Sequence, residues 1–159
     1  SDKNNKINYK SRNFKNYMKQ TIKTQWLGNM LFNADSLGGS FKIDAAAESG
    51  GEGKGVRPKA LMLSSLAGCT GMDIISLLKK MRAEVDHLEI DVTGELTDEH
   101  PKFYNKVLVE YRFYGMDLKK DKIEKAVKLS AEKYCGVMEM FRQFAEITTT
   151  LEYIEKKSS

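Results

Sequence analysis

The fold is decided by the stretch that runs from Arg57 to Lys80, RPKALMLSSLAGCTGMDIISLLKK. Pro58 suits the first turn of a helix, because its missing N–H donor would have no intrahelical partner there in any case. Apolar residues follow around much of the helical circumference, and Lys79 and Lys80 suit the negative end of the helix dipole. The stretch therefore predicts a central helix that is buried within the fold.

The chain ahead of this helix carries the pattern of a hairpin and a loop. Residues 21–32 mix β-branched, aromatic and apolar side chains, residues 33–39 are turn formers, and residues 40–46 again favour a strand. The glycines of residues 49–55 confine the backbone least, so this segment predicts a flexible loop, which we expect near the active centre.

The chain after the helix alternates between apolar and polar residues, which predicts a second hairpin over residues 88–96 and 107–113. Asp121 suits the first turn of a further helix, which Gly136 is expected to interrupt. A second short helix then carries the apolar residues Val137, Met140, Phe141 and Phe144. A last strand over residues 148–154 completes the order β-β-α-β-β-α-α-β, which is an α+β fold.

The size and composition of the chain predict one domain. It has 159 residues, of which 41% are hydrophobic and 30% charged, and a chain of this size can bury most of its apolar surface in one core. We expect a basic polar leader over residues 1–20, whose order the sequence leaves open, and a single domain over residues 21–159. The net charge of +4 is concentrated at the two ends, so no groove for nucleic acid is expected.

The leader lacks the apolar core of a secretory signal, which favours a cytoplasmic location. Two cysteines without such a signal also fit a reducing compartment, where thiols serve chemistry or packing rather than structural disulfides. Residues 60–78 are long and apolar enough to cross a bilayer, but they include Ser64, Ser65 and the ionisable Asp73. We therefore expect a buried helix and no membrane association.

Cys69 and Cys135 are the two cysteines of the chain. A free cysteine is commonly a small buried side chain without any chemical role. Cys69, however, lies between Gly68 and Gly71, and a glycine in a helix interior costs about 1 kcal/mol relative to alanine. Such a cost suggests close packing at the glycines or access to the thiol, so both a structural and a reactive role stay open.

Two segments of the chain resemble the OsmC/Ohr family. The first begins at Arg57-Pro58 and continues through residues 60–70, ALMLSSLAGCT, and the second is residues 129–135, LSAEKYC. His100-Pro101, between the strands of the second hairpin, also matches the family pattern. The resemblance extends from about residue 28 to residue 154.

The resemblance implies an OsmC-like fold in which antiparallel sheets enclose the central helices of an intertwined homodimer, with active centres at the subunit interface. By similarity, Cys69 attacks an organic or lipid hydroperoxide and becomes a sulfenic acid, and Cys135 condenses with it into a disulfide. A cellular dithiol then reduces the disulfide. The implied function is a thiol-dependent peroxidase in defence against oxidative stress.

The chain departs from the peroxidases of the family at two positions. They carry a Glu after the proline that opens the central helix, and an Arg in the N-terminal strands. Here Lys59 and Ala60 follow the proline, and residues 21–41 contain no arginine. Because a thiolate needs nearby positive charge, Arg57 is the proposed substitute, with Lys59 and Lys133 as weaker candidates. The alternative for all three is an ordinary exposed cation, which fits Lys59 and Lys133 better.

Asp73, one helical turn beyond Cys69, complicates this chemistry, because a carboxylate raises the pKa of a neighbouring thiol unless it pairs with an arginine. Neither His87 nor His100 has ligand neighbours at a spacing typical of zinc, and the loop of residues 50–55 matches no phosphate-binding pattern. The sequence therefore predicts no metal and no cofactor.

Two other functions fit the sequence. Without the family's Glu and Arg, the chain could be a non-enzymatic relative that binds a small lipophilic ligand at the dimer interface, or a redox-responsive protein that binds a partner through its leader. A set of apolar side chains could line such a ligand pocket or form ordinary core: Trp26, Met30, Phe32, Met62, Met72, Met138, Met140 and Phe141.

Overall fold

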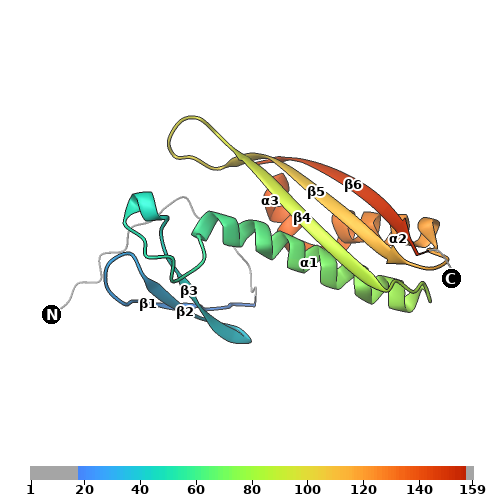
Figure 1. Ribbon diagram of the computed structural model, residues 1–159, viewed down its shortest axis with the longest axis horizontal. Coiled ribbons are helices and arrows are strands. Elements are labelled where there is room, and N and C mark those ends of the chain that lie inside the picture. Colours follow the sequence, from blue (N-terminus) through green and yellow to red (C-terminus); the bar gives the residue numbers. More distant parts are fainter. Residues whose placement is uncertain (1–17, 157–159) are drawn as a thin grey trace.

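The computed structural model describes residues 18–156, which form two three-stranded sheets and three α-helices (Figure 1). The first sheet consists of β1 (Lys23–Trp26), β2 (Phe32–Ser36) and β3 (Gly39–Ile43). The second consists of β4 (His87–Leu96), β5 (Tyr104–Gly115) and β6 (Glu146–Glu155). The helices are α1 (Pro58–Lys80), α2 (Lys120–Leu129) and α3 (Gly136–Arg142). The predicted α+β class is confirmed, whereas residues 1–17 of the expected leader lie outside the described residues.

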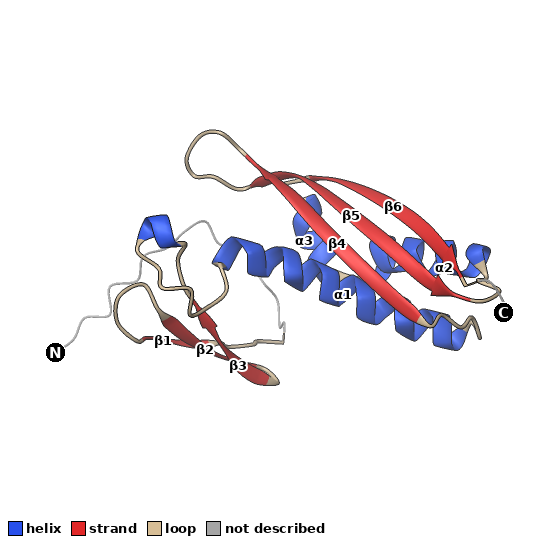
Figure 2. Ribbon diagram, viewed as in Figure 1, coloured by secondary structure: helices blue, strands red, loops and turns tan. Residues whose placement is uncertain are grey.

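The long helix α1 packs against the second sheet, and α2 and α3 lie beside it on the same face of that sheet (Figure 2). Its buried residues are Leu66, Thr70, Ile74 and Leu78, a spacing of four that places them in one stripe along the helix. The sequence predicts a central helix that is buried within the fold, and one chain supplies only part of this cover. The second sheet and the two short helices cover only one side of α1, and Met72 on the other side is 72% exposed.

Length and composition alone would let α1 cross a membrane, since its mean hydropathy reaches 1.6 over an 18-residue window. The Leu66 to Leu78 stripe nevertheless packs on the core of its own chain, as the core helix of a globular domain does.

The second sheet presents alternate residues to the helices. Val107, Val109, Tyr111 and Phe113 of the central strand β5 are each at most 2% exposed, as their alternation in the sequence predicts. Strands β4 and β5 are antiparallel, but β5 and β6 pair in parallel. The expectation of purely antiparallel sheets is therefore corrected. The helical connection through α2 and α3 returns the chain to the starting end of the sheet, which is the crossover that parallel pairing requires.

The first sheet has three strands where the sequence predicted a two-stranded hairpin. Residues 33–36, which the sequence predicts to form a turn, belong to β2, and the turn is limited to Leu37-Gly38. The polar side chains form hydrogen bonds within the sheet instead, because the Asp35 carboxylate accepts from Asn33 Nδ2 at 2.9 Å and from Ser40 Oγ at 2.8 Å.

The loop between β3 and α1 is organised around the buried carboxylate of Asp44. It accepts three backbone N–H groups at 2.8 to 3.0 Å, those of Ala45, Glu52 and Lys54. These hydrogen bonds hold the pKa of Asp44 below its ordinary value, and the one from the Lys54 N–H has the largest effect. A Cβ at Gly51 would lie 1.8 Å from the Ala45 carbonyl oxygen, so only glycine allows the backbones of residues 45 and 51 to lie this close. The loop lies at the beginning of α1 (Figure 1), and its expected place near the active centre stays a prediction.

We expect Leu66→Ala to lower the free energy of unfolding by about 2–5 kcal/mol, because it removes a fully buried side chain between α1 and the second sheet. The matched control is Leu37→Ala, at a turn where the leucine is 66% exposed and less than about 1 kcal/mol should be lost. Urea denaturation at one protein concentration measures both. Equal losses in the two variants would contradict the packing described here.

Candidate functional site

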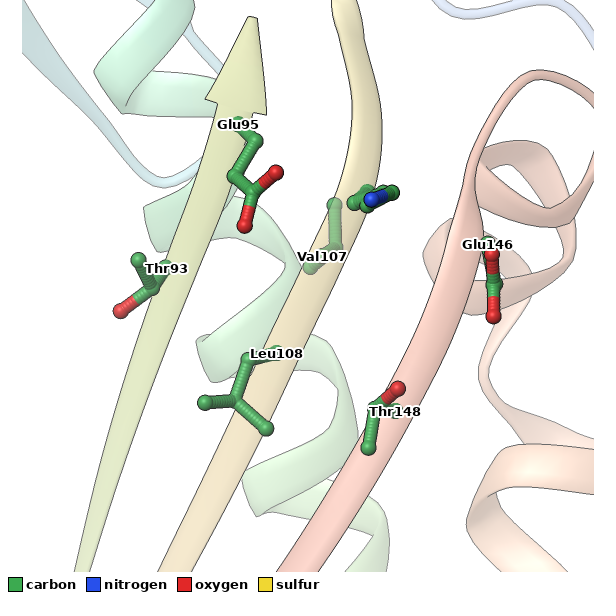
Figure 3. A pocket seen from close by; sticks show the side chains of 7 residues that line it. Thr93, Glu95, Val107, Leu108, Glu146 and Thr148 are labelled. Carbon is green, nitrogen blue, oxygen red and sulfur yellow. The ribbon is translucent and has the colours of Figure 1, made fainter.

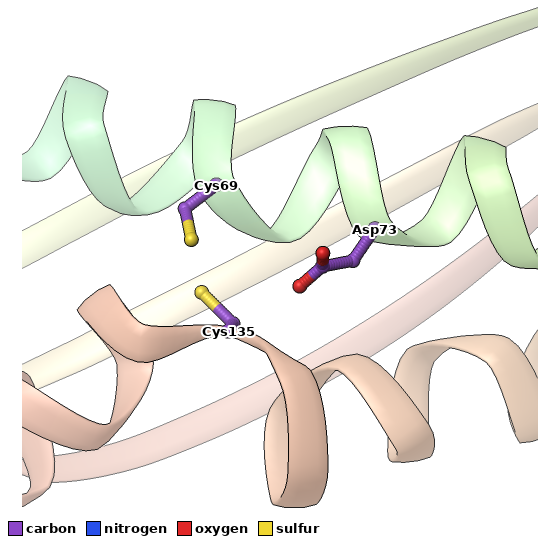
Figure 4. Close-up of side chains that lie close together, drawn as sticks. All are labelled: Cys69, Asp73 and Cys135. Atoms are coloured by element: carbon purple, nitrogen blue, oxygen red, sulfur yellow. The ribbon is translucent and has the colours of Figure 1, made fainter.

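The two cysteines face each other between α1 and the connection that leads into α3 (Figure 4). Cys69 lies midway along α1, and Cys135 follows a π-helical turn, Ser130–Tyr134. Their Sγ atoms and a carboxylate oxygen of Asp73 all lie within 4.8 Å of one another, and both thiols are free. The fold thus brings together two sulfurs that the sequence separates by 66 positions.

Cys135 is held in place by the backbone on both sides of it. Its N–H donates to the Ser130 carbonyl at 2.8 Å, which closes the π-helical turn, and its backbone is extended (φ −75°, ψ 100°). Its Sγ accepts the N–H of Met138 at 3.3 Å and so caps the first turn of α3. The helix break expected at Gly136 therefore falls at Cys135, and Gly136 is the first residue of α3.

The two thiols differ in exposure, and burial changes the pKa of Cys135. Cys135 is 3% exposed, whereas Cys69 is partly exposed. Burial, and after it the adjacent Cys69 sulfur, raises the pKa of Cys135 to about 12, and only the Met138 N–H acts in the opposite direction. At neutral pH Cys135 is therefore a protonated thiol, and Cys69 is the sulfur that a reagent from solvent reaches.

A chain of buried hydroxyl groups leads from the second sheet to this site. Thr70 Oγ1 lies 2.7 Å from Tyr111 Oη and 3.0 Å from Ser130 Oγ. Ser130 Oγ in turn donates to Asp73 Oδ2 at 3.2 Å. Because a carboxylate only accepts, the direction follows: Ser130 donates to Asp73 and accepts from Thr70, which accepts from Tyr111. Burial raises the pKa of Tyr111 to about 12, so this donor keeps its proton.

Sequence reasoning missed Thr70, Tyr111 and Ser130. A signal for two of them exists, since Thr70 falls on the buried stripe of α1 and Ser130 continues the apolar face of α2. A hydroxyl in such a stripe needs a buried partner. The sequence leaves open whether Asp73 pairs with an arginine. Within residues 18–156 no arginine pairs with it, and its partner is the Ser130 hydroxyl.

Arg57 does not lie with the thiols of its own chain. It is the residue before α1, its Nη1 donates to the Gly55 carbonyl at 3.1 Å, and its charge helps to lower the pKa of Asp44. It precedes Cys69 by 12 residues (69 − 57), or about 18 Å of helix axis at about 1.5 Å per residue. Its assignment to the active centre stays a prediction.

The two weaker candidate cations also lie elsewhere. Lys59 Nζ is 3.4 Å from the Lys102 carbonyl oxygen, and Lys133 Nζ is 5.3 Å from the centre of the Tyr134 ring. Of the histidines, His87 lies beside Glu89 on the second sheet, and His100 lies in the turn between β4 and β5. Neither histidine is part of the thiol cluster.

Two hollows in the surface are alternative sites. One lies on the outer face of the second sheet, among Thr93, Glu95, Glu146 and Thr148, and has no thiol in its lining (Figure 3). The other is an apolar groove of about 490 Å³. It is lined by Met62, Phe103, Tyr104 and Phe144, with Lys59 and Lys102 beside them.

The apolar side chains that the sequence assigned to a pocket or a core fall into three groups in the single chain. Met138 and Phe141 are core residues, each 1% exposed. Met62 lines the apolar groove. The others, including the expected core residue Met140, are exposed in the single chain: Trp26, Met30, Phe32, Met72 and Met140.

Comparison with known proteins gives consistent matches. The family model described as OsmC-like protein matches residues 51–150. Protein YhfA of Escherichia coli (strain K12) is 31% identical over 132 residues, 83% of this chain and 96% of that protein.

Solved structures share the fold. A hypothetical protein from Aquifex aeolicus VF5 is 28% identical with a TM-score of 0.78, over 89% of this chain and 100% of that one. The organic hydroperoxide resistance protein OsmC of Legionella pneumophila is 16% identical with a TM-score of 0.64, over 86% and 99%. The region that the family model matches includes both cysteines, Asp73 and the hydroxyl chain. The chain belongs to the family of OsmC-like proteins.

Proposed function

We propose that this chain reduces organic or lipid hydroperoxides through a cycle of its two cysteines. The observation that supports this most is the pairing of a partly exposed Cys69 with a buried, protonated Cys135, their sulfurs within 4.8 Å. Membership of the OsmC-like family supports a redox role in peroxide resistance in general, and one solved relative is named an organic hydroperoxide resistance protein.

In the first step the Cys69 thiolate attacks the terminal oxygen of the hydroperoxide. The O–O bond breaks, the alkoxide takes a proton and leaves as an alcohol, and Cys69 becomes a sulfenic acid. In the second step the sulfur of Cys135 attacks the sulfur of Cys69, a disulfide forms and water leaves. A cellular dithiol then supplies the two electrons that restore both thiols.

The surroundings of the thiols suit this division of roles. The protonated Cys135 can donate a hydrogen bond toward the Cys69 sulfur, which favours negative charge there. The short distance also favours resolution, because the sulfenic acid meets a thiol before it meets a second peroxide.

A homodimer is part of this proposal. In the single chain, α1 has an exposed stripe that includes Ser65, Gly68, Met72 and Ile75, and a Cβ at Gly68 would meet nothing within 4 Å. The first sheet leaves Trp26 66% exposed. A second copy would cover these apolar surfaces, and Arg57, which does not reach Cys69 in its own chain, would act only across such an interface. A cytoplasmic location supplies the dithiol and is proposed with it.

The alternative function is the binding of a small lipophilic ligand without turnover. The groove around Met62 and Phe144 favours it, because its lining is mostly apolar with two lysines at the edge. A parent protein that binds such a ligand but consumes no hydroperoxide would support this alternative over the peroxidase.

One equivalent of cumene hydroperoxide should convert the reduced protein to the intramolecular disulfide, with a loss of two hydrogens in intact-mass analysis. Cys69→Ser should consume no peroxide above background. Cys135→Ser should instead gain oxygen at Cys69 and then overoxidise, because no thiol remains to resolve the sulfenic acid.

The chain has 8 methionines, whose oxidation also adds oxygen, so the double variant Cys69→Ser/Cys135→Ser gives the background. Two thiols that remain free in the parent after treatment would rule out the cycle.

The pKa of about 12 makes Cys135 a thiolate in about one molecule in ten thousand at pH 8. Because the thiolate is the form that is alkylated, iodoacetamide should modify Cys69 well before Cys135, and modification of Cys135 should increase only as the pH rises toward 12. Peptide mapping by mass spectrometry measures both rates, and the urea-denatured chain, where they should be equal, is the control. Faster alkylation of Cys135 in the folded protein would reverse the assigned roles.

Light scattering on a sizing column should give the mass of a homodimer for the parent. Met72→Glu should shift the protein toward the monomer, because it places a charge in the surface that the second copy covers. Met116→Glu is the matched control at the turn after β5, where the methionine is 60% exposed and no loss of dimer is expected. A parent that is monomeric at every concentration would contradict the dimer.

A further inference from the structure

We propose that Cys69, Cys135 and Asp73 together form a binding site for a zinc ion in the reduced protein. Their donor atoms, two sulfurs and one carboxylate oxygen, lie within 4.8 Å of one another. Figure 4 shows Cys69 and Asp73 projecting from one face of α1 toward Cys135. No zinc-binding spacing in the sequence indicates this site, because Cys135 is 66 positions away from Cys69.

The distances suit a tetrahedral ion. Zinc binds thiolate sulfur at about 2.3 Å, which places two ligated sulfurs about 3.8 Å apart. Since the present separations are at most 4.8 Å, a modest side-chain rotation brings all three donors to the metal. Two thiolates favour zinc over magnesium, calcium or manganese, which prefer oxygen ligands.

The residues around the three donors orient them. Ser130 Oγ donates to Asp73 Oδ2 at 3.2 Å and is fixed in turn by Thr70. The backbone N–H of Met138 points at the sulfur of Cys135 from 3.3 Å. Groups that hydrogen-bond to metal ligands and hold them in one orientation are typical of zinc sites.

Solvent can supply the fourth ligand. A cavity of about 130 Å³ borders Asp73 and is lined further by Ser76, Leu77, Lys80 and Tyr134. A water molecule occupies about 30 Å³, so water can approach the carboxylate of Asp73 from this side. Three protein ligands and a water are the arrangement of zinc sites that keep an exchangeable position.

The site shares its two sulfurs with the proposed peroxide cycle but does not depend on it. Zinc requires both sulfurs reduced and uses the lone pairs with which Cys69 would attack a peroxide. The bound ion therefore competes with oxidation and with alkylation of the same atoms.

The test titrates the reduced, full-length chain with zinc under argon, in competition with a chromophoric chelator. We expect one ion per chain, and cobalt in its place should give a thiolate-to-metal charge-transfer band. Asp73→Asn, which keeps the size of the side chain, should weaken zinc binding at least about tenfold, and each Cys→Ser variant should weaken it further. Asp98→Asn, in the turn after β4, removes the same charge away from the site and should leave the affinity unchanged.

Ser130→Ala provides a second variant, since losing the hydrogen bond to Asp73 should weaken binding about tenfold, and far-UV circular dichroism checks the fold of each variant. A reduced parent that binds no zinc, or a folded Asp73→Asn variant with the affinity of the parent, overturns the site. Peroxide consumption by a parent that binds no zinc would overturn the metal site alone. Zinc binding by a parent that consumes no peroxide would overturn the proposed function and support the metal site.

Discussion

The packing of one stripe of α1 on the second sheet is the constraint on which the site depends. Leu66, Thr70, Ile74 and Leu78 face the core, and this fixes the rotation of the helix about its axis. Once that rotation is set, Cys69 and Asp73, each beside a member of the stripe, must point toward α3 and the π-helical turn before it. The chemistry of the site is therefore a consequence of which face of α1 is buried.

The sequence predicted the order of the elements well, because alternation and helical caps are local signals. Four of the six buried residues of β5 are the ones whose alternation the sequence shows, and Pro58 does begin the long helix. The failures have local causes too. The polar residues of β2 have the composition of a turn, and only the structure shows that they form hydrogen bonds across the sheet. The helical break after α2 falls at Cys135 because its sulfur, and not a glycine, caps α3.

The candidate site could be predicted only in part. The two cysteines were identified from the resemblance to a family, but their separation is a tertiary property that no spacing reveals. The hydroxyl chain of Tyr111, Thr70 and Ser130 crosses three elements, so only the fold assembles it. The apolar residues around much of α1 predict a buried helix but do not say which surfaces cover it, and one chain covers only one side.

The cap on α3 links the covalent state of a sulfur to the architecture of the last part of the chain. The atom that accepts the first amide of the helix, Cys135 Sγ, is the same atom that any disulfide or metal bond would engage. When this sulfur shares a lone pair with another sulfur or a metal ion, it accepts the Met138 N–H less strongly. The cap then stabilises less the helix that buries Met138 and Phe141. Helix α3 also contacts β6, so only one element separates this sulfur from the edge strand of the second sheet.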